Sequence, residues 1–495
     1  MTITISNCST SGSIESPRAG GIAVDINANN VEEVIIEDCI SQTDIVAHSG
    51  ASIANTLKLG KSGSPTPITG SITVDNCLAE GSVDYGDFSG YSKSNSEHSG
   101  FVGTVDSVDG DTDDVTIDSC TTTTDVSGYI IRGFVTENAD STILNSDTSS
   151  ELSAYDDANV SGASSAGFVG SNSGLVEDCE RTGDVTQPFS NIASGFVGAN
   201  SGTIQSSIVD GAVKSASGIA AGFCTQNQST IETSGALVDV TTTNGNSIPI
   251  DVSTTGFVGQ NSGTVERCFS KCTIDSSADI AAGFVGTNDG SISNTYAQVS
   301  SFDGDTSTIS GGYVSVNENV VDTSYVAVVG GVTNGQAFAT ENNGDITDSY
   351  YDETLDSSAV VGTEGTPSTT DITPLQTPLM QGDSAETNMS LFDFNTVWQV
   401  VSDSSKKIPE DDYPILRDIS LDEQLELRDI FEVTIDAGEA VVGGAWLARD
   451  EKTTVVAERG ESIYLGWKHN QSDTVVIGTE DEFSDKDEKT KIYEV

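Results

Sequence analysis

Basic residues are scarce in this sequence. It contains 20 Lys and Arg against 76 Asp and Glu, which leaves a formal net charge of −56. A surface that binds nucleic acid or anionic lipid needs clustered Lys and Arg to neutralise phosphate groups, and the sequence has no such cluster. We therefore expect no nucleic-acid partner and no binding to anionic membranes.

Long apolar runs and histidine are scarce as well. No stretch approaches the about 18 consecutive apolar residues that a membrane-spanning helix needs, so we expect no membrane insertion. Residues 1–8 contain neither a basic segment nor an apolar one, so we expect no signal peptide there. The three histidines, His48, His98 and His469, belong to no recognisable metal or triad motif. The sequence predicts a protein that is not an enzyme.

The acidic residues are spread along the whole chain. Disorder is a common reason for such acidity, but it fits badly with the regularly repeated apolar positions described below. A folded, Lys-poor, acidic surface resembles that of proteins from extreme halophiles, because molar salt screens charge repulsion beyond roughly 3 Å. The composition predicts a high-salt source.

A box of the form Gly-Phe-Val-Gly-x-Asn-x-Gly-x-Ile/Val repeats along the chain. Close copies span residues 167–176, 195–204, 256–265 and 283–292. When the copies are aligned, aromatic residues share one column and asparagines share another, four residues later. The clearest members are Phe168, Phe196, Phe257 and Phe284 in the aromatic column and Asn172, Asn200, Asn261 and Asn288 in the asparagine column.

Short β-prone pieces between Gly, Asn and Ser turn signals predict an all-β parallel solenoid, in which like residues stack about 4.8 Å apart. We expect the phenylalanines to fill the core and the asparagines to hydrogen-bond from coil to coil at the corners. Ligand binding by the asparagine column is the alternative. A third column, Ile/Val-x-x-Cys, extends the pattern to the N-terminus and raises the estimate to about 12 coils.

The cysteines of this third column are spaced one coil or more apart, unlike zinc ligands. We interpret them as buried thiols that act as small apolar residues. Disulfides between stacked coils are the alternative, and Cys268 with Cys272 is the one close pair. The column contains Cys8, Cys39, Cys77, Cys120, Cys179 and Cys268.

Changes in composition divide the chain into three parts. Residues 1–350 contain the repeats, and residues 351–420 are richer in proline and aromatic residues, which we expect to end the solenoid and cover its open end. Residues 421–495 predict a small β domain of about five strands after a short helix, which serves as anchor, cap or oligomerisation module. Three insertions, residues 45–67, 85–99 and 104–115, are expected to form flank loops that carry specificity.

The repeated box, followed by Cys or Ser, resembles the GLUG motif of bacterial and archaeal surface proteins, adhesins and some secreted peptidases. The resemblance covers residues 100 to about 416. It implies a right-handed β-helix and an adhesin-like protein, here of haloarchaeal or haloarchaeal-virus type. It implies no particular activity, because the repeat is a scaffold in proteins with different functions.

One acidic segment suggests a metal. Asp109, Asp111, Asp113 and Asp114 alternate around a glycine, and converging carboxylates of this kind bind calcium. The closing bidentate Glu of a calcium loop is missing, so a solvated acidic loop is the alternative. No other cofactor is indicated.

These observations predict a non-enzymatic rod on an external surface. The first hypothesis is a tail fibre, spike or decoration protein on the virion surface of a halophilic archaeal virus, binding a host cell-surface glycan or glycoprotein. Its C-terminal domain would contact other virion or surface proteins, and a homotrimer is plausible. The alternatives are an extracellular adhesin on a haloarchaeal cell surface and a glycan-degrading β-helix enzyme.

The charge balance leads to a prediction about salt. We expect the melting temperature to rise when KCl is raised from dilute buffer to molar concentration, because screening reduces the repulsion among the acidic side chains. Thermal unfolding followed by circular dichroism measures this. Equal stability at both salt concentrations would contradict the expectation.

Overall fold

The protein is seen here in a computed structural model. The structure describes residues 2–28, 32–59, 70–107, 115–155, 164–188, 191–216, 218–243, 253–304, 309–332, 335–365, 368–401 and 412–424, together with short strands between residues 430 and 494.

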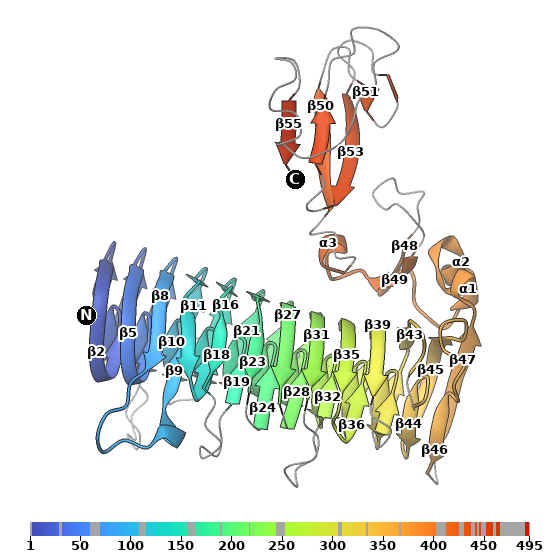
Figure 1. The fold of residues 1–495 in the computed structure, drawn as a ribbon, viewed down its shortest axis with the longest axis horizontal. Coiled ribbons are helices and arrows are strands. Elements are labelled where there is room, and N and C mark those ends of the chain that lie inside the picture. The colour runs from blue at the N-terminus through green and yellow to red at the C-terminus, as the bar shows by residue number, and fades with distance from the viewer. Residues whose placement is uncertain are drawn as a thin grey trace.

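The fold is a parallel β-helix, which confirms the predicted all-β solenoid (Figure 1). Among the described residues, one sheet has 12 strands, one from each coil, and a second sheet contains 35 strands from the other sides of the coils. The predicted number of coils is therefore correct. The strands of the first sheet are β3 (Ala23–Ala28), β6 (Ala54–Leu59), β10 (Val102–Ser107), β15 (Val135–Ala139), β20 (Val169–Asn172), β25 (Val197–Asn200), β29 (Cys224–Asn227), β33 (Val258–Asn261), β37 (Val285–Asn288), β41 (Val314–Asn317), β44 (Ala339–Asn342) and β46 (Val361–Glu364).

A representative coil begins with β20 and continues through four short strands before β25 starts the next coil. Parallel pairing sets each residue beside its equivalent one coil later, as Asn172 is paired with Asn200. The repeat in the sequence therefore becomes a set of columns in space. The four strands are β21 (Leu175–Glu177), β22 (Glu180–Thr182), β23 (Val185–Gln187) and β24 (Asn191–Ser194).

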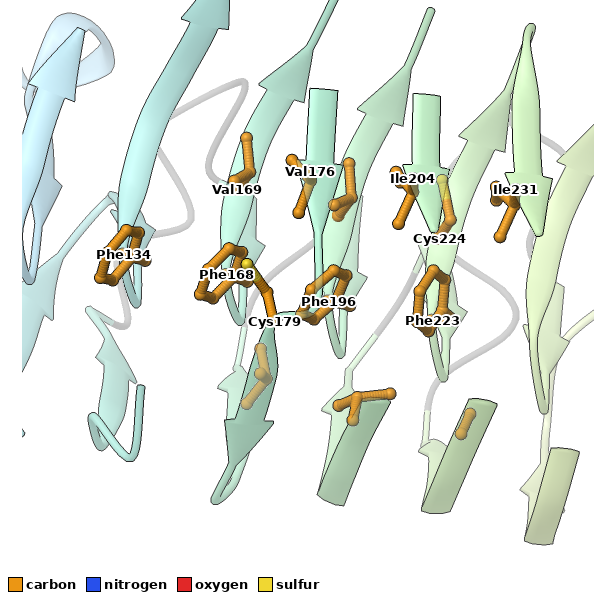
Figure 2. Close-up of a cluster of buried hydrophobic side chains, with 14 of the residues drawn as sticks. Phe134, Phe168, Val169, Val176, Cys179, Phe196, Ile204, Phe223, Cys224 and Ile231 are labelled. Carbon is orange, nitrogen blue, oxygen red and sulfur yellow. The ribbon is translucent and has the colours of Figure 1, made fainter. Parts of the chain in front are cut away.

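The aromatic column lies in the core. Rings of successive coils stack with centroids 4.6–5.1 Å apart, and Figure 2 shows four of them in line. Phe168, Phe196, Phe257 and Phe284 are fully buried. Toward the N-terminus the same backbone position is held by Ile53 and Ile22, so the core continues where the Gly-Phe box is absent.

The asparagine column forms a ladder. Along the column from Asn138 to Asn342, the Nδ2 of every asparagine except the last donates to the Oδ1 of the asparagine one coil later, at 2.7–2.8 Å. Asn172, Asn200, Asn261 and Asn288 are all rungs of this ladder. It begins beside Val105, and the Oδ1 of Asn138 has no hydrogen-bond partner in the described part of the chain.

The corner before each Cys, Ser or Thr of the third column has a left-handed backbone. Residues such as Asn7, Asp38 and Asp178 have φ near 50°, a region that Asn and Asp tolerate better than most residues. The eight cysteines are free thiols, and all except Cys8 are buried. Burial raises the pKa of Cys268 well above its usual range, which keeps this thiol protonated and unreactive.

All three predicted flank insertions are wrong in part, since residues 97–99 of the insertion 85–99 form β9 (Glu97–Ser99), a strand of the larger solenoid sheet. Residues 45–59 are not a loop, because β5 (Ile40–Ala51) and β6 continue the coil. Residues 104–107 likewise belong to β10. Ile53, Ala54 and Leu57 are fully buried, and they occupy the positions that hold Phe, Val and Asn in the repeated box.

The solenoid ends with β46 and β47 (Thr369–Leu375), which complete the last coil. The described residues that follow, 376–401 and 412–424, do not cover the open end as predicted, because they pack on the flank. This strap contains α1 (Thr377–Met380), α2 (Gly382–Asn388), β48 (Trp398–Val401), β49 (Asp412–Leu416) and α3 (Leu421–Gln424), and it lies along the flank of the last coils (Figure 1).

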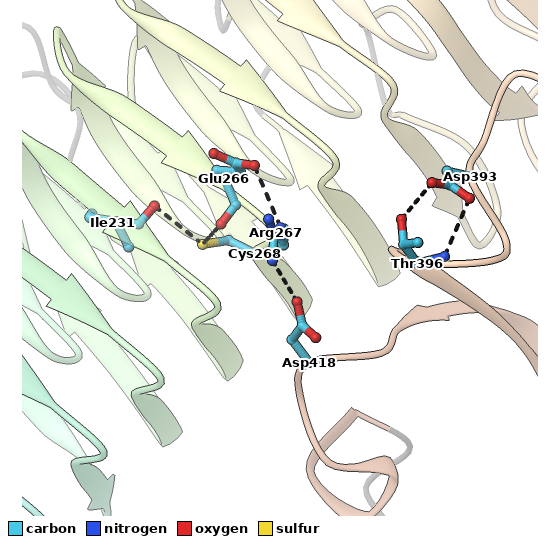
Figure 3. A network of polar contacts seen from close by, with 7 residues as sticks. All are labelled: Ile231, Glu266, Arg267, Cys268, Asp393, Thr396 and Asp418. Carbon is cyan, nitrogen blue, oxygen red and sulfur yellow. Dashed lines mark hydrogen bonds and ion pairs between the residues drawn. The ribbon is translucent and has the colours of Figure 1, made fainter.

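The strap packs on an outward-facing aromatic column, Phe269, Tyr296, Tyr325 and Tyr350. The hydroxyl of Tyr325 donates to the carbonyl of Pro414 at 2.8 Å. Arg267 leaves the solenoid at a left-handed corner and donates to Asp418 at 2.6 Å, as Figure 3 shows. An apolar stripe of this size needs a cover, which explains the position of the strap.

Beyond the strap, the described strands pair in antiparallel fashion, in agreement with the predicted small β domain. The pairs are β50 (Ile430–Asp436) with β53 (Lys452–Glu458), β51 (Val441–Val442) with β52 (Ala445–Trp446), and β54 (Ser462–Leu465) with β55 (Lys491–Glu494). One of the about five strands predicted for residues 421–495, which we expect at residues 474–477, falls outside the described residues. In the described part of the chain, no helix has the length and apolarity to cross a membrane.

Truncation of one core ring tests this packing. Phe257→Ala should lower the unfolding free energy by about 3–5 kcal/mol, because it removes one ring from the middle of a stack and leaves a cavity. Denaturant unfolding in molar KCl measures the loss, with Phe257→Leu as the milder control. A loss below about 1 kcal/mol would contradict a core role.

Candidate functional site

An open cavity of about 760 Å³ lies on the outer face of the solenoid. Its floor consists of β22, β27 (Ile208–Ser215), β31 (Gly235–Thr242) and β35 (Phe269–Ser276), and it ends at β39 (Tyr296–Gly304). We call this cavity the flank groove. The side chains used below are Glu180, Thr182, Asp184, Asp210, Ala212, Lys214, Leu237, Asp239, Lys271, Thr273 and Ser300.

Parallel register arranges these side chains in outward columns. One column runs Thr182, Asp210, Leu237, Lys271, and the next runs Ala212, Asp239, Thr273. Neighbours in a column are about 4.8 Å apart. The groove therefore offers carboxylates, ammonium groups and hydroxyls on a rigid and evenly spaced surface.

A β-bulge shapes one end of the flank groove. The register between β35 and β39 shifts after Cys272, which pairs with Val299, so that Thr273 pairs with Ser301. Ser300 is the additional residue, and it lines the groove. Bulges redirect side chains locally and are frequent near binding sites.

Lysine is distributed unevenly in this part of the chain. Between residues 115 and 401 the sequence contains two lysines, Lys214 and Lys271, and both line the flank groove. They lie on strands two coils apart. The restriction of lysine to these two positions is the feature of the sequence that could have marked the groove. We did not predict the groove from it.

A buried arginine lies beside the same site. Arg181 points into the solenoid, is fully buried, and donates to the carbonyl oxygens of Gly183 and Asp184. Burial lowers its pKa to about 10, so it remains charged at neutral pH, and the nearby carboxylates of Asp184 and Asp210 favour the charged form. Gly167 makes room for it, because a Cβ there would collide with the arginine side chain.

Two carboxylates of the flank groove are held by the protein itself. Asp184 accepts a hydrogen bond from the backbone N–H of Ala212 at 3.0 Å. Asp239 accepts one from the hydroxyl of Thr273 in the next coil. These contacts fix the direction in which the carboxylates face the open groove.

A second cluster forms around the predicted insertion 85–99. His48 and His98, which are far apart in the sequence, both lie beside Tyr85, with ring centroids 6.3 and 6.1 Å away. Tyr91 covers His48 at 4.7 Å and is about half exposed. The insertion thus supplies an aromatic patch on the flank, as well as η1 (Lys93–Asn95) and β9 (Glu97–Ser99).

His98 is buried in this cluster. Its Nε2 lies 3.0 Å from the carbonyl oxygen of Ala47, while its Nδ1 has no hydrogen-bond partner among the described residues. Burial lowers the pKa of His98 to about 4. The side chain is therefore neutral at physiological pH and stabilises the fold only in that form.

The predicted phenylalanine and asparagine columns do not line the flank groove. The phenylalanine and asparagine columns lie inside the solenoid and its corners. The calcium candidates Asp109, Asp111, Asp113 and Asp114 lie outside the described residues. Within the described ranges, no three His, Cys, Asp or Glu side chains are placed to hold a metal ion.

Comparisons with known proteins add no relative. No protein-family model, no curated protein and no solved structure matches the chain. The resemblance to GLUG-motif proteins therefore remains a prediction from the repeated box.

The buried histidine predicts a specific pH dependence. Its pKa is about 6.5 in an unfolded chain and about 4 in the fold, so the unfolded state takes up the proton first and stability is lost as the pH falls through this window. Between pH 7 and pH 5 the wild type should lose about 2 kcal/mol more unfolding free energy than His98→Gln. Denaturant unfolding at both pH values measures this, and parallel losses in the two proteins would contradict it.

Proposed function

We propose that the protein is a non-enzymatic recognition rod displayed on an external surface, and that the flank groove binds carbohydrate of a host cell envelope. The observation that carries this proposal is the difference between the residues inside the solenoid and those on its flank. The repeated columns are used for packing and corner formation, whereas the flank groove places polar side chains of both charges on the outside.

The chemistry of the flank groove suits a sugar. Carbohydrates present many hydroxyl groups, so they need both acceptors and donors at fixed spacing. Asp210 and Asp239 offer acceptors, Lys214 and Lys271 offer donors, and Thr273 offers both. The solenoid holds these groups without an entropic cost of ordering a loop, which favours binding.

The setting we favour is the virion of a halophilic archaeal virus, as a tail fibre, spike or decoration protein. The acidic composition and the rod-like scaffold support it. In this proposal the C-terminal β domain contacts other virion or surface proteins, and a homotrimer is a natural assembly for a fibre. A cell-surface adhesin of a haloarchaeon would use the same groove, and detection of the chain in purified virions separates the two.

A glycan-degrading enzyme is the second candidate. Four carboxylates, Glu180, Asp184, Asp210 and Asp239, line one cavity, and glycoside hydrolysis uses paired carboxylates. Incubation with host envelope polysaccharide in molar KCl distinguishes a recognition protein from a glycan-degrading enzyme. New reducing or unsaturated ends that disappear in Asp210→Asn would replace our proposal with the enzymatic one.

Blocking the flank groove tests the recognition role. Fluorescently labelled protein should bind haloarchaeal cells in molar KCl, and periodate oxidation of the cell glycans should abolish binding. Ala212→Trp fills the middle of the groove and should weaken binding at least tenfold. The matched control is Ser153→Trp, an exposed position on the same flank outside the groove, which should bind like wild type. Equal binding by both variants would overturn the proposal.

A further inference from the structure

We infer that the flank groove is specific for a carbohydrate that bears carboxylate groups, namely a glycan containing hexuronic acid. This inference rests on the proposed function, because it names the ligand class of the same groove. It follows from the positions of Lys214 and Lys271, and from the contacts that the protein itself makes to the carboxylates of the groove.

The local charge of the flank groove differs from that of the rest of the protein. Four acidic side chains line it, and the two lysines together with the buried Arg181 supply three positive charges, so the site is close to neutral (4 against 3). The whole chain has 76 acidic against 20 basic residues. An anionic ligand therefore meets less repulsion here than the composition of the whole chain would give.

The carboxylates on the Arg181 side of the groove are compensated from within. Arg181 interacts favourably with Asp184 and Asp210 from below the sheet, and Asp184 also accepts the Ala212 N–H. On the other side, Asp239 accepts a hydrogen bond from the hydroxyl of Thr273. These contacts offset negative charge where an anionic sugar would approach, and leave acceptor capacity for sugar hydroxyl groups.

The two lysines lie at opposite corners of the groove. Lys214 is on β27 and Lys271 is on β35, two coils further along the axis and four positions earlier in the strand register. Their Cα atoms are roughly 16 Å apart by strand and coil spacing. Two ammonium groups at this separation suit a chain with carboxylates on more than one sugar unit.

High salt permits this recognition. In molar salt the repulsion from the acidic surface is screened beyond roughly 3 Å, whereas direct ammonium–carboxylate contacts in a groove are screened less. An acidic glycan can therefore approach a protein with a net charge of −56 and be held by local contacts. Charge-assisted hydrogen bonds are stronger than neutral ones, so the lysines favour an acidic sugar over a neutral one.

Matched pairs of probes test the inference. The full-length protein is titrated by calorimetry in molar KCl with short oligomers of galacturonate, glucuronate, mannuronate and guluronate, each beside its methyl ester. At least one acidic oligomer should bind at least about tenfold more tightly than its ester, because esterification removes the charge and little else.

Variants assign the effect to the two lysines. Lys214→Gln and Lys271→Gln should each weaken binding of the acidic oligomer about tenfold and leave binding of the ester unchanged, whereas Lys214→Arg retains binding. Lys58→Gln removes one positive charge outside the groove and is the matched control. Melting curves establish that each variant is folded.

The outcomes separate this inference from the proposed function. Equal affinity for acid and ester, with loss of both in Ala212→Trp, would overturn the uronate specificity and keep carbohydrate recognition. Preference for the ester, or lysine variants that bind like wild type, would also overturn the specificity. A folded protein that binds neither these probes nor haloarchaeal cells would overturn both.

Discussion

In-register stacking of parallel coils is the constraint on which the structure depends. Each coil must present the same kind of residue at the same place as the coil before it, because adjacent backbones are only about 4.8 Å apart. The core rings, the asparagine ladder and the left-handed corners are three consequences of this rule. Glycine is needed at the start of the box for the same reason, since a Cβ at Gly195 would collide with the carbonyl oxygen of Gly222 in the next coil.

The columns also explain where variation is permitted. Each asparagine bonds to the asparagines of the adjacent coils, so the ladder stops where a neighbour differs, as at its first rung, Asn138, beside Val105. Outward positions are free of this requirement, because solvent can satisfy their polar groups. Residues with specific chemistry therefore gather on the flank, where Lys214 and Lys271 line one groove from strands two coils apart.

The flank has two different surfaces. The aromatic column that begins at Phe269 is covered by the strap, and Arg267 and Tyr325 hold the strap by polar contacts. The adjacent columns, with Asp210, Asp239 and the two lysines, stay open as the flank groove. The change occurs within one strand, since β35 supplies both a covered Phe269 and a groove-lining Lys271.

The sequence by itself determined the solenoid, its number of coils and the content of its interior columns, because these follow from a repeat that is visible along one dimension. The prediction of a flank loop at residues 45–59 was wrong, because aliphatic residues such as Ile53 take the core positions there without the Gly-Phe box. Only the tertiary structure decided the flank groove and the position of the strap. Both depend on which outward residues become neighbours, and coils of unequal length hide that register until the strands are paired.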